Sequence, residues 1–295
     1  MLCVLMVCSA SPAGGPPCTL FVGDDFESGT PGSQLDGRTA GPLTWSASAG
    51  ATIAAQAVPC RADLDADGLV NGTDITLILN AWNSAGPAGD LNGDGVVNGV
   101  DISVVLTLWG PCAPSANNVA DLGPAPPLGQ PPASALAQWV GDPVMLGAVP
   151  LFVSFEEHPS AAGGVSSRTT EIGSLTSGAT FIRLAAPIDP STGGTGPLIV
   201  NGFSTQKAID PGVPTQIIVE FAPGSPIDPT TRAVRVLVRD PLTVAQFGPD
   251  PVEIFPAGTP APDPFLISGV GEIDFARFTG DGRRLDALAV ASCPP

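Results

Sequence analysis

Two acidic stretches of the chain repeat one pattern of oxygen-bearing side chains at an offset of 27 residues, over 63–74 and 90–101. Each stretch places a side-chain oxygen at loop positions 1, 3, 5, 9 and 12 and a glycine at position 6. Position 7 is apolar, and its backbone carbonyl can also bind a cation. A hard cation such as calcium requires about six or seven oxygens at about 2.3–2.6 Å. The pattern therefore predicts two calcium-binding loops.

The acids of each loop need a cation to offset their mutual repulsion. Seven aspartates and one arginine lie between Cys60 and Cys112, so this segment has a formal charge of −6, which two divalent ions would reduce to −2. Gly68 and Gly95 stand where each loop must turn sharply, a conformation that glycine adopts readily. The predicted ligands of the first ion are Asp63, Asp65, Asp67, the carbonyl of Leu69, Asn71 and Asp74. Those of the second ion are Asp90, Asn92, Asp94, the carbonyl of Val96, Asn98 and Asp101.

An apolar pattern of helical period follows each loop, which predicts two short helices. Two such apolar faces can bury each other. Each helix has a second apolar stripe that the contact between the two helices does not bury. A partner or the chain's own second domain could cover it. The first faces comprise Ile75, Ile78, Leu79 and Trp82, and Ile102, Val105, Leu106 and Trp109. The second stripes comprise Leu77 with Ala81, and Val104 with Leu108.

Residues 60–112 resemble the dockerins, the duplicated calcium-loop–helix modules that attach secreted proteins to cohesin receptors. The resemblance rests on two complete loops at fixed spacing, on Asp at position 12, and on the flanking cysteines Cys60 and Cys112. It implies a small α-helical module that binds two Ca²⁺ ions and a cohesin-like protein domain. The positions before the last ligand are Gly72-Thr73 and Gly99-Val100 rather than the usual Ser/Thr pair, so the sequence does not identify the receptor. A calcium-rigidified spacer without a receptor is the alternative.

The first residues are typical of a secretory signal, because an apolar run from Met1 to Cys8 is followed by small residues. The first basic residue is Arg38, so the usual positive start is missing, and a buried strand is the alternative. We expect residues 1–13 to be removed and the protein to be secreted or attached to the cell surface. The four remaining cysteines suit an oxidising compartment and allow three pairings. Their positions favour Cys60–Cys112 nested within Cys18–Cys293.

Composition excludes several classes of function. The formal charge is −17, and Lys207 is the single lysine, so no basic surface is expected to bind nucleic acid. No stretch of about 20 uncharged apolar residues follows the signal, which argues against a transmembrane segment. The sequence contains one histidine and no tyrosine, which excludes most of the usual general acid–base pairs and zinc-ligand sets. No nucleophile elbow, phosphate loop or HExxH motif occurs.

The rest of the chain indicates a mainly β fold. Residues 113–137 are rich in proline and poor in charge, which predicts a linker. Residues 138–295 contain short alternating segments between turn residues, as in 232–239, and predict an antiparallel β-sandwich. This part loosely resembles the jelly-roll ectodomains of secreted bacterial proteins, which implies a jelly-roll-like sandwich. Residues 18–59 form a short β segment, too short for an independent sandwich, that could add strands to it.

The function of the sandwich is left open by its residues. A glycosidase needs two carboxylates that face each other across a cleft. Glu156 or Glu157 could instead share a structural calcium with Asp286. We favour a third interpretation, in which these acids are simply exposed to solvent. The glycosidase candidates are Glu156, Glu157, Glu272, Asp274 and Asp286. His158 precedes a proline and is expected to be exposed and inert, and Trp45 and Trp139 are the aromatics left for a polysaccharide surface. We interpret the chain as an exported, non-catalytic, calcium-binding anchoring protein. Polysaccharide binding or degradation is the alternative, so an enzymatic role stays open.

Overall fold

The chain separates into two compact units in a computed structural model. The larger unit comprises 1–54, 118–238 and 252–295, and the smaller comprises 55–117 and 239–251. The expected signal, 1–13, and the cysteines Cys60 and Cys112 lie outside the described residues. Within the described part of the chain, no helix has the length and apolar character to cross a membrane. The structure describes residues 18–57, 62–65, 67, 69–84, 89–91, 96–111, 116–124, 130–139, 144–145, 149–158, 168–187, 196–208, 215–223, 231–239, 252–254, 265–268 and 271–294.

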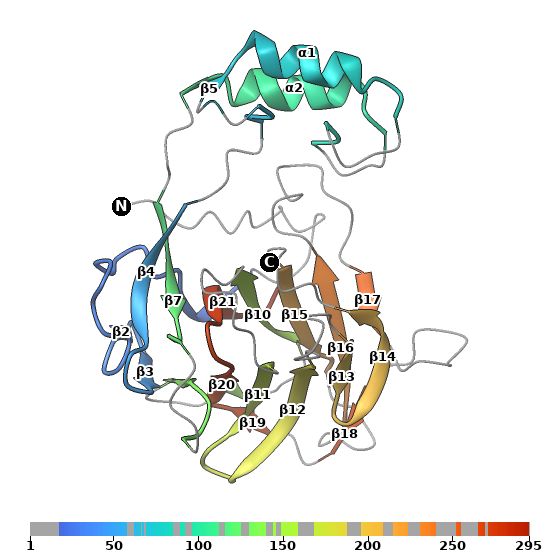
Figure 1. Cartoon of the computed structure of the whole chain (residues 1–295). Coiled ribbons are helices and arrows are strands. Elements are labelled where there is room, and N and C mark those ends of the chain that lie inside the picture. The colour runs from blue at the N-terminus through green and yellow to red at the C-terminus, as the bar shows by residue number, and fades with distance from the viewer. Residues whose placement is uncertain are drawn as a thin grey trace. The chain divides into compact units, whose positions relative to one another are not determined.

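Two antiparallel sheets make up most of the larger unit (Figure 1). Sheet A has the order β17 (Val252–Ile254), β16 (Arg232–Arg239), β15 (Thr215–Phe221), β10 (Leu151–His158), β21 (Arg284–Ala291), β7 (Ala116–Asp121) and β4 (Thr52–Ala57), with β1 (Leu20–Asp24) on β21 and β18 (Phe265–Ile267) on β16. Sheet B has the order β14 (Phe203–Ala208), β13 (Pro197–Val200), β12 (Ala179–Ala186), β11 (Arg168–Ser174), β20 (Phe275–Thr279), β8 (Ser134–Trp139), β3 (Leu43–Ala47) and β2 (Thr39–Ala40). A separate pair joins β19 (Glu272–Ile273) to β9 (Val144–Met145).

The core of the larger unit is made by side chains from both sheets. The ring of Phe155 on β10 meets the ring of Phe278 on β20 edge to face, 5.1 Å between centroids. Trp45 on β3 stacks on Phe278 at 6.2 Å. On β16 the alternation predicted from the sequence is present, since Val234 and Val236 are fully buried and Arg235 between them is not. The prediction of a mainly β, antiparallel sandwich with a small helical module is confirmed.

Residues 18–59 contribute strands to both sheets. β1 pairs with β21, and β3 pairs with β8. A buried carboxylate fixes this segment, because Asp24 accepts hydrogen bonds from Arg38 Nε at 2.8 Å and Trp45 Nε1 at 3.0 Å. The pKa of Arg38 is raised, chiefly by its hydrogen bond to Asp24. Trp45 therefore belongs to the core and is not available as an exposed sugar-binding ring.

The structure differs from the expected linker over 113–137, because this range contains β7 and most of β8. β8 is a central strand that pairs with β3 on one side and β20 on the other. Ala135 and Ala137 face the core, while Ser134 and Leu136 are only partly buried. The sequence did not reveal this period-two pattern, because the buried positions are small alanines, which give a weak hydrophobic signal. The many prolines of the range indicated a linker instead.

A disulfide joins Cys18, just before β1, to Cys293, just after β21, with 5.4 Å between the two Cα atoms. The prediction of this pair is confirmed. The bond connects two strands that are neighbours in sheet A but lie at opposite ends of the chain.

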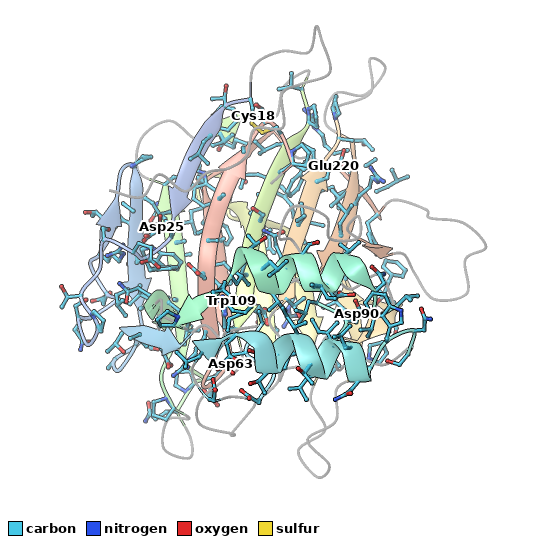
Figure 2. All side chains as sticks on the ribbon, turned by 90° about the horizontal axis from the view of Figure 1, so that it is seen from above. Cys18, Asp25, Asp63, Asp90, Trp109 and Glu220 are labelled. Carbon is cyan, nitrogen blue, oxygen red and sulfur yellow. A yellow bond between two sulfur atoms is a disulfide. The ribbon has the colours of Figure 1, made fainter. Side chains whose placement is uncertain are left out.

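The smaller unit contains two antiparallel helices, α1 (Gly72–Asn80) and α2 (Gly99–Thr107) (Figure 1). The paired strands β5 (Leu69–Val70) and β6 (Gly110–Pro111) join the start of α1 to the end of α2. At the other end, the N–H of Asn83 donates to the carbonyl of Val97 at 2.9 Å. Accordingly, Asp63 and Trp109 lie at one end of the helix pair and Asp90 at the other (Figure 2). The buried apolar residues of this unit are Ala62, Val70, Ile78, Leu91, Val97 and Val105.

Candidate metal centre

Both helices begin with the same capping arrangement. The side-chain oxygen of Asn71 accepts a hydrogen bond from the N–H of Thr73 at 2.7 Å. Its counterpart 27 residues later, Asn98, accepts from the N–H of Val100 at 2.8 Å. An asparagine at this position satisfies a backbone N–H that has no partner within the helix. Loop position 9, a predicted ligand in both loops, is therefore also the helix cap.

Position 12 closes each loop against the helix that follows. Asp74 is fully buried, and its two oxygens accept from the N–H groups of Leu64 at 2.7 Å and Asn71 at 2.8 Å. Asp101 repeats this with Leu91 and Asn98, both at 2.7 Å. A carboxylate oxygen has more than one lone pair, so these bonds leave acceptor capacity for a cation. Each aspartate connects the start of its loop to the first turn of its helix.

Three further carboxylates of the first loop converge. One oxygen each from Asp63, Asp65 and Asp67 lies within 4.8 Å of the other two. The N–H of Asp67 donates to Asp63 Oδ1 at 3.1 Å and to Asp65 Oδ1 at 3.2 Å, which holds the turn. The pKa of the Asp65 carboxyl is raised, first by lost hydration and then by the negative charges of Asp67 and Asp74. Like charges held this closely favour a bound cation, and carboxylate oxygen is the donor that calcium prefers.

The remaining predicted ligands lie at equivalent places in the two loops. The carbonyl of Leu69 accepts from Asn71 Nδ2 at 3.4 Å, and that of Val96 accepts from Asn98 Nδ2 at 2.9 Å. Asp90 begins the second loop as Asp63 begins the first. Two predicted ligands of the second ion, Asn92 and Asp94, lie outside the described residues.

The exposed face of the helices differs from the one expected. Ile78 and Val105 are buried as predicted, but Leu79 and Leu106 are 53 % and 57 % exposed. The expected leftover residues Ala81 and Val104 instead pack against the core of the unit. The reason is the inward direction of Asp74 and Asp101. In a helix, residues four positions apart lie on the same face, so Ile78 and Val105 point inward like the two aspartates. Leu79 and Leu106 are one position further along, which turns them by about 100° away from that face.

The helix pair consequently presents apolar side chains to solvent. Sequence periodicity assigned Leu79, Trp82, Leu106 and Trp109 to the buried face, and of the residues exposed here it predicted only Leu108 to be left over for a partner. The exposed apolar residues of the helices and the turns that follow them are Leu79, Trp82, Val100, Leu106, Leu108 and Trp109.

In the sandwich, several acids proposed as catalytic candidates are held by other groups. Glu157 is buried and accepts from Arg168 Nη1 at 2.8 Å and from Arg283 Nη2. Asp274 accepts from the N–H of Leu175 at 2.7 Å, and Glu272 accepts from Ser174 Oγ at 3.1 Å. These contacts give the three acids structural roles.

The expected exposure of His158 is wrong, and Trp139, one of the aromatics considered for a polysaccharide surface, is buried. His158 is 8 % exposed rather than solvated, because β10 continues through it and pairs it with Arg284 of β21. Trp139 is buried, and its Nε1 donates to the carbonyl of Ile273 at 2.6 Å. With Trp45 also in the core, neither tryptophan supplies the exposed ring that a polysaccharide-binding surface would use.

Comparisons with known proteins give a match for the helical module and neighbours of low similarity for the chain as a whole. Residues 61–108 match the family model of the dockerin type I domain, which confirms the resemblance drawn from the loops. No curated protein sequence matches the chain. Among solved structures, the chain is similar to the exoplasmic/lumenal domain of VIP36 with Ca²⁺ and Man2 bound, with 11 % identity, a TM-score of 0.35, and coverage of 61 % of this chain and 78 % of that one. It is also similar to arcelin-5, a lectin-like defense protein from Phaseolus vulgaris, with 9 % identity, a TM-score of 0.30, and coverage of 60 % and 86 %.

Proposed function

We propose that the dockerin type I module of residues 61–108 binds two calcium ions and, when loaded, attaches the β-sandwich of an exported protein to a cohesin-type domain in an extracellular or cell-surface assembly. The observation that carries the proposal is the convergence of Asp63, Asp65 and Asp67 within the segment that matches this family. In this reading the chain is a non-catalytic anchoring protein.

The first ion is proposed to lie among the three converging carboxylates. Asp63, Asp65 and Asp67 offer oxygens from one side, and the carbonyl of Leu69 is held nearby by Asn71. The remaining lone pairs of Asp74 close the site from the side of α1. An all-oxygen set of this kind suits calcium.

The second ion is proposed from the repetition of the loop. Asn98 and Asp101 make the same backbone hydrogen bonds as their counterparts 27 residues earlier, at distances that agree within 0.1 Å. Two loops with the same hydrogen bonds at positions 9 and 12 and the same sequence pattern are expected to hold the same kind of ion.

Ion binding and docking are coupled through position 12. Asp74 and Asp101 lie in the first turns of α1 and α2 while also closing the loops. An ion that orders a loop therefore fixes the helix that carries the exposed apolar residues, among them Leu79, Leu106 and Trp109. A partner covering those side chains would remove apolar surface from water, which supplies affinity.

Export is supported by the disulfide between Cys18 and Cys293. Structural disulfides persist in oxidising compartments and are rare in reducing ones. The proposed location is therefore outside the cytoplasm, consistent with the expected signal over 1–13.

Calcium titration of the purified chain tests the metal sites. We expect two ions per chain by calorimetry, and a first-site affinity lowered at least about tenfold by Asp63→Asn. The control is Asp25→Asn, a change at a partly exposed acid of the sandwich (Figure 2), which should leave both sites intact. Chelation should increase amide exchange over 62–111 far more than over 150–292. Equal loss of protection in both ranges, or no heat on adding calcium, would contradict the proposal.

Binding to a purified cohesin domain tests the docking function. We expect association in calcium and none in chelator. Leu106→Ser should weaken it, whereas Leu266→Ser, a change at a 72 % exposed leucine of the sandwich, should not. Equal weakening by both variants, or association that persists in chelator, would exclude docking through the calcium-loaded helices.

A further inference from the structure

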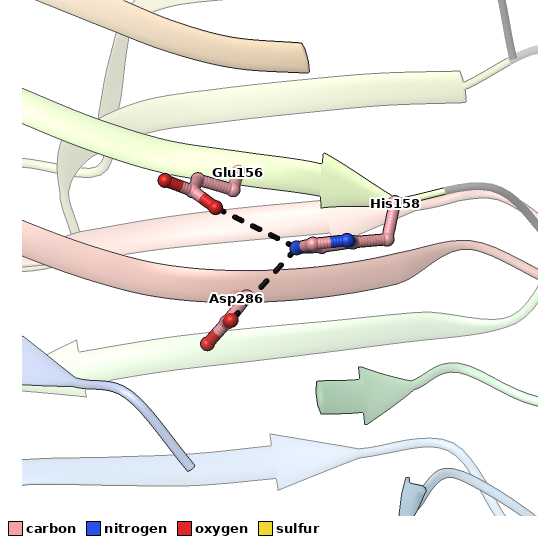
Figure 3. Close-up of side chains that lie close together, drawn as sticks. All are labelled: Glu156, His158 and Asp286. Atoms are coloured by element: carbon pink, nitrogen blue, oxygen red, sulfur yellow. Dashed lines mark ion pairs between the residues drawn. The ribbon is translucent and has the colours of Figure 1, made fainter. Parts of the chain in front are cut away.

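Three side chains able to bind a metal meet on sheet A, in the unit that contains no calcium loop. Glu156 on β10 and Asp286 on β21 are directly paired across the two strands. His158 follows two residues after Glu156, so it lies on the same face of the sheet. Figure 3 shows the imidazole between the two carboxylates.

The distances between these groups fit a shared ion better than hydrogen bonds. His158 Nε2 lies 3.6 Å from Glu156 Oε2 and 3.8 Å from Asp286 Oδ2. Both separations exceed the usual hydrogen-bond range of about 2.7–3.2 Å. Ligand atoms about 2.0–2.2 Å from a tetrahedral zinc ion lie about 3.3–3.6 Å from one another. The two separations from His158 Nε2 would need to shorten by only a few tenths of an ångström to hold such an ion, and one ligand atom from each of the three residues lies within 4.8 Å of the other two.

We propose that Glu156, His158 and Asp286 form a binding site for a divalent transition-metal ion of the zinc type, separate from the calcium loops. Imidazole nitrogen suits zinc and its neighbours in the periodic table, whereas calcium takes about six to eight oxygens. Three protein ligands leave a fourth position for water or another group. The side chain of Glu156, with 20 % of its surface exposed, provides the side from which an ion can enter.

The surrounding residues orient both carboxylates toward His158. Gln216 Nε2 lies 3.5 Å from Glu156 Oε1, and the N–H of Ala287 donates to Asp286 Oδ1 at 2.7 Å. In each acid the other oxygen is therefore the one that faces the imidazole. Partners that fix the direction of a ligand in this way are a regular part of metal sites.

A β-bulge places Asp286 on this face. The register between β10 and β21 shifts between Ser154 and Glu156, where β21 has one residue more. Leu285 and Leu288 both lie in the core although they are three residues apart, a spacing that a regular strand would put on opposite faces. Ala287 between them has a φ of 48°, which is rare for a residue other than glycine. Bulges commonly redirect a side chain next to a functional site.

Burial and charge support a divalent ion. The side chains of His158 and Asp286 are 8 % and 7 % exposed. Glu156 and Asp286 place two carboxylates in this largely dehydrated surrounding, where a divalent cation between them would be attracted to both.

Zinc titration in excess calcium tests this site, because calcium occupies the loops and leaves the sandwich free to report. We expect one Zn²⁺ per disulfide-bonded chain and a change in the imidazole resonances of His158, which are unambiguous because the chain has one histidine. Glu156→Gln and Asp286→Asn should each lower the zinc affinity at least about tenfold. Glu220→Gln, a partly buried acid of the same sheet that pairs with Arg235, is the matched control and should have no effect.

The competing arrangement is an ion pair between a protonated His158 and the two acids. It predicts no saturable zinc binding by the unaltered protein, and that result would overturn the proposal even if the variants fold poorly. Zinc binding that leaves the His158 resonances unchanged would overturn it as well. Because calcium binding and docking are measured separately, their failure would not affect this site.

Discussion

Glu157 brings a negative charge into the interior of the sandwich, where its side chain is 5 % exposed. Two guanidinium groups, those of Arg168 and Arg283, each contact one of its oxygens. Arg283 also donates to Thr170 Oγ1 and to the carbonyl of Thr169, both at 2.6 Å. Burial lowers the pKa of Arg283, because desolvation disfavours its charged form, while the charge of Glu157 acts in the opposite direction. The negative charge of Glu157 therefore offsets part of the free-energy cost of burying two positively charged guanidinium groups.

Replacing Glu157 by glutamine should therefore destabilise the sandwich strongly. The amide keeps the size of the side chain but leaves two buried positive charges without a counter-charge, and breaking a buried pair of this kind costs about 3–5 kcal/mol. Urea unfolding of Glu157→Gln, followed by tryptophan fluorescence, measures the loss.

A matched change at a more exposed ion pair provides the control. Glu220 pairs with Arg235, whose side chain is 43 % exposed, at 3.0 Å. Glu220→Gln should cost at most about 1 kcal/mol, because solvent screens such pairs. Similar losses for both variants would mean that the buried contacts contribute no more than the exposed one.

Individual residues of the sandwich were also the hardest to predict. The sequence places Glu156, His158 and Asp286 on strands, yet the bulge at Ala287 leaves no signal in the residue pattern. Only the pairing of β10 with β21, which places Glu156 opposite Asp286, brings the three side chains together. By contrast, Asp63, Asp65 and Asp67 lie within five residues, so their convergence follows from the loop pattern.

At the scale of elements, the rotation of α1 and α2 is set by their first turns. Asp74 and Asp101 must face inward to close the loops, and this requirement outweighs the hydrophobicity of Leu79 and Leu106. Periodicity predicted the existence of both helices but could not predict which side faces solvent, because it treats an aspartate as a surface residue. A polar residue with two backbone partners can occupy a core position.

Removing a cap should loosen one helix selectively. Asn71→Ala deletes the acceptor for the N–H of Thr73, and losing an N-cap of this kind costs about 1 kcal/mol. Measured in chelator, so that metal affinity does not contribute, amide exchange in 72–80 should become faster while the sandwich is unchanged. Thr76→Ala removes the exposed hydroxyl that bonds to the carbonyl of Gly72 and should have a smaller effect. An unchanged exchange rate over α1 in Asn71→Ala would show that the cap does not limit its stability.

At the scale of the whole molecule, the helical module is inserted in the sequence between segments that both belong to the sandwich. β1 and β3 precede the module in sequence, and their partners β21 and β8 follow it. The sandwich therefore depends on pairings between segments that are distant in sequence. Bringing such segments together on folding costs conformational entropy, because a long loop of chain must close. The bond between Cys18 and Cys293 reduces that cost in the unfolded state.

Removing this disulfide should weaken the sandwich and leave the helical module unaffected. In Cys18→Ala combined with Cys293→Ala, the unfolded chain regains the freedom of a span of 275 residues, and the expected loss is about 2–5 kcal/mol. Because β1 is tied to β21 beside the bond, amide exchange in Leu20–Asp24 should increase first. Thermal unfolding measures the sandwich, and calcium calorimetry on the same variant measures the loops, which should keep their affinity. A variant that loses calcium affinity while its sandwich unfolds at the original temperature would contradict this division of the molecule.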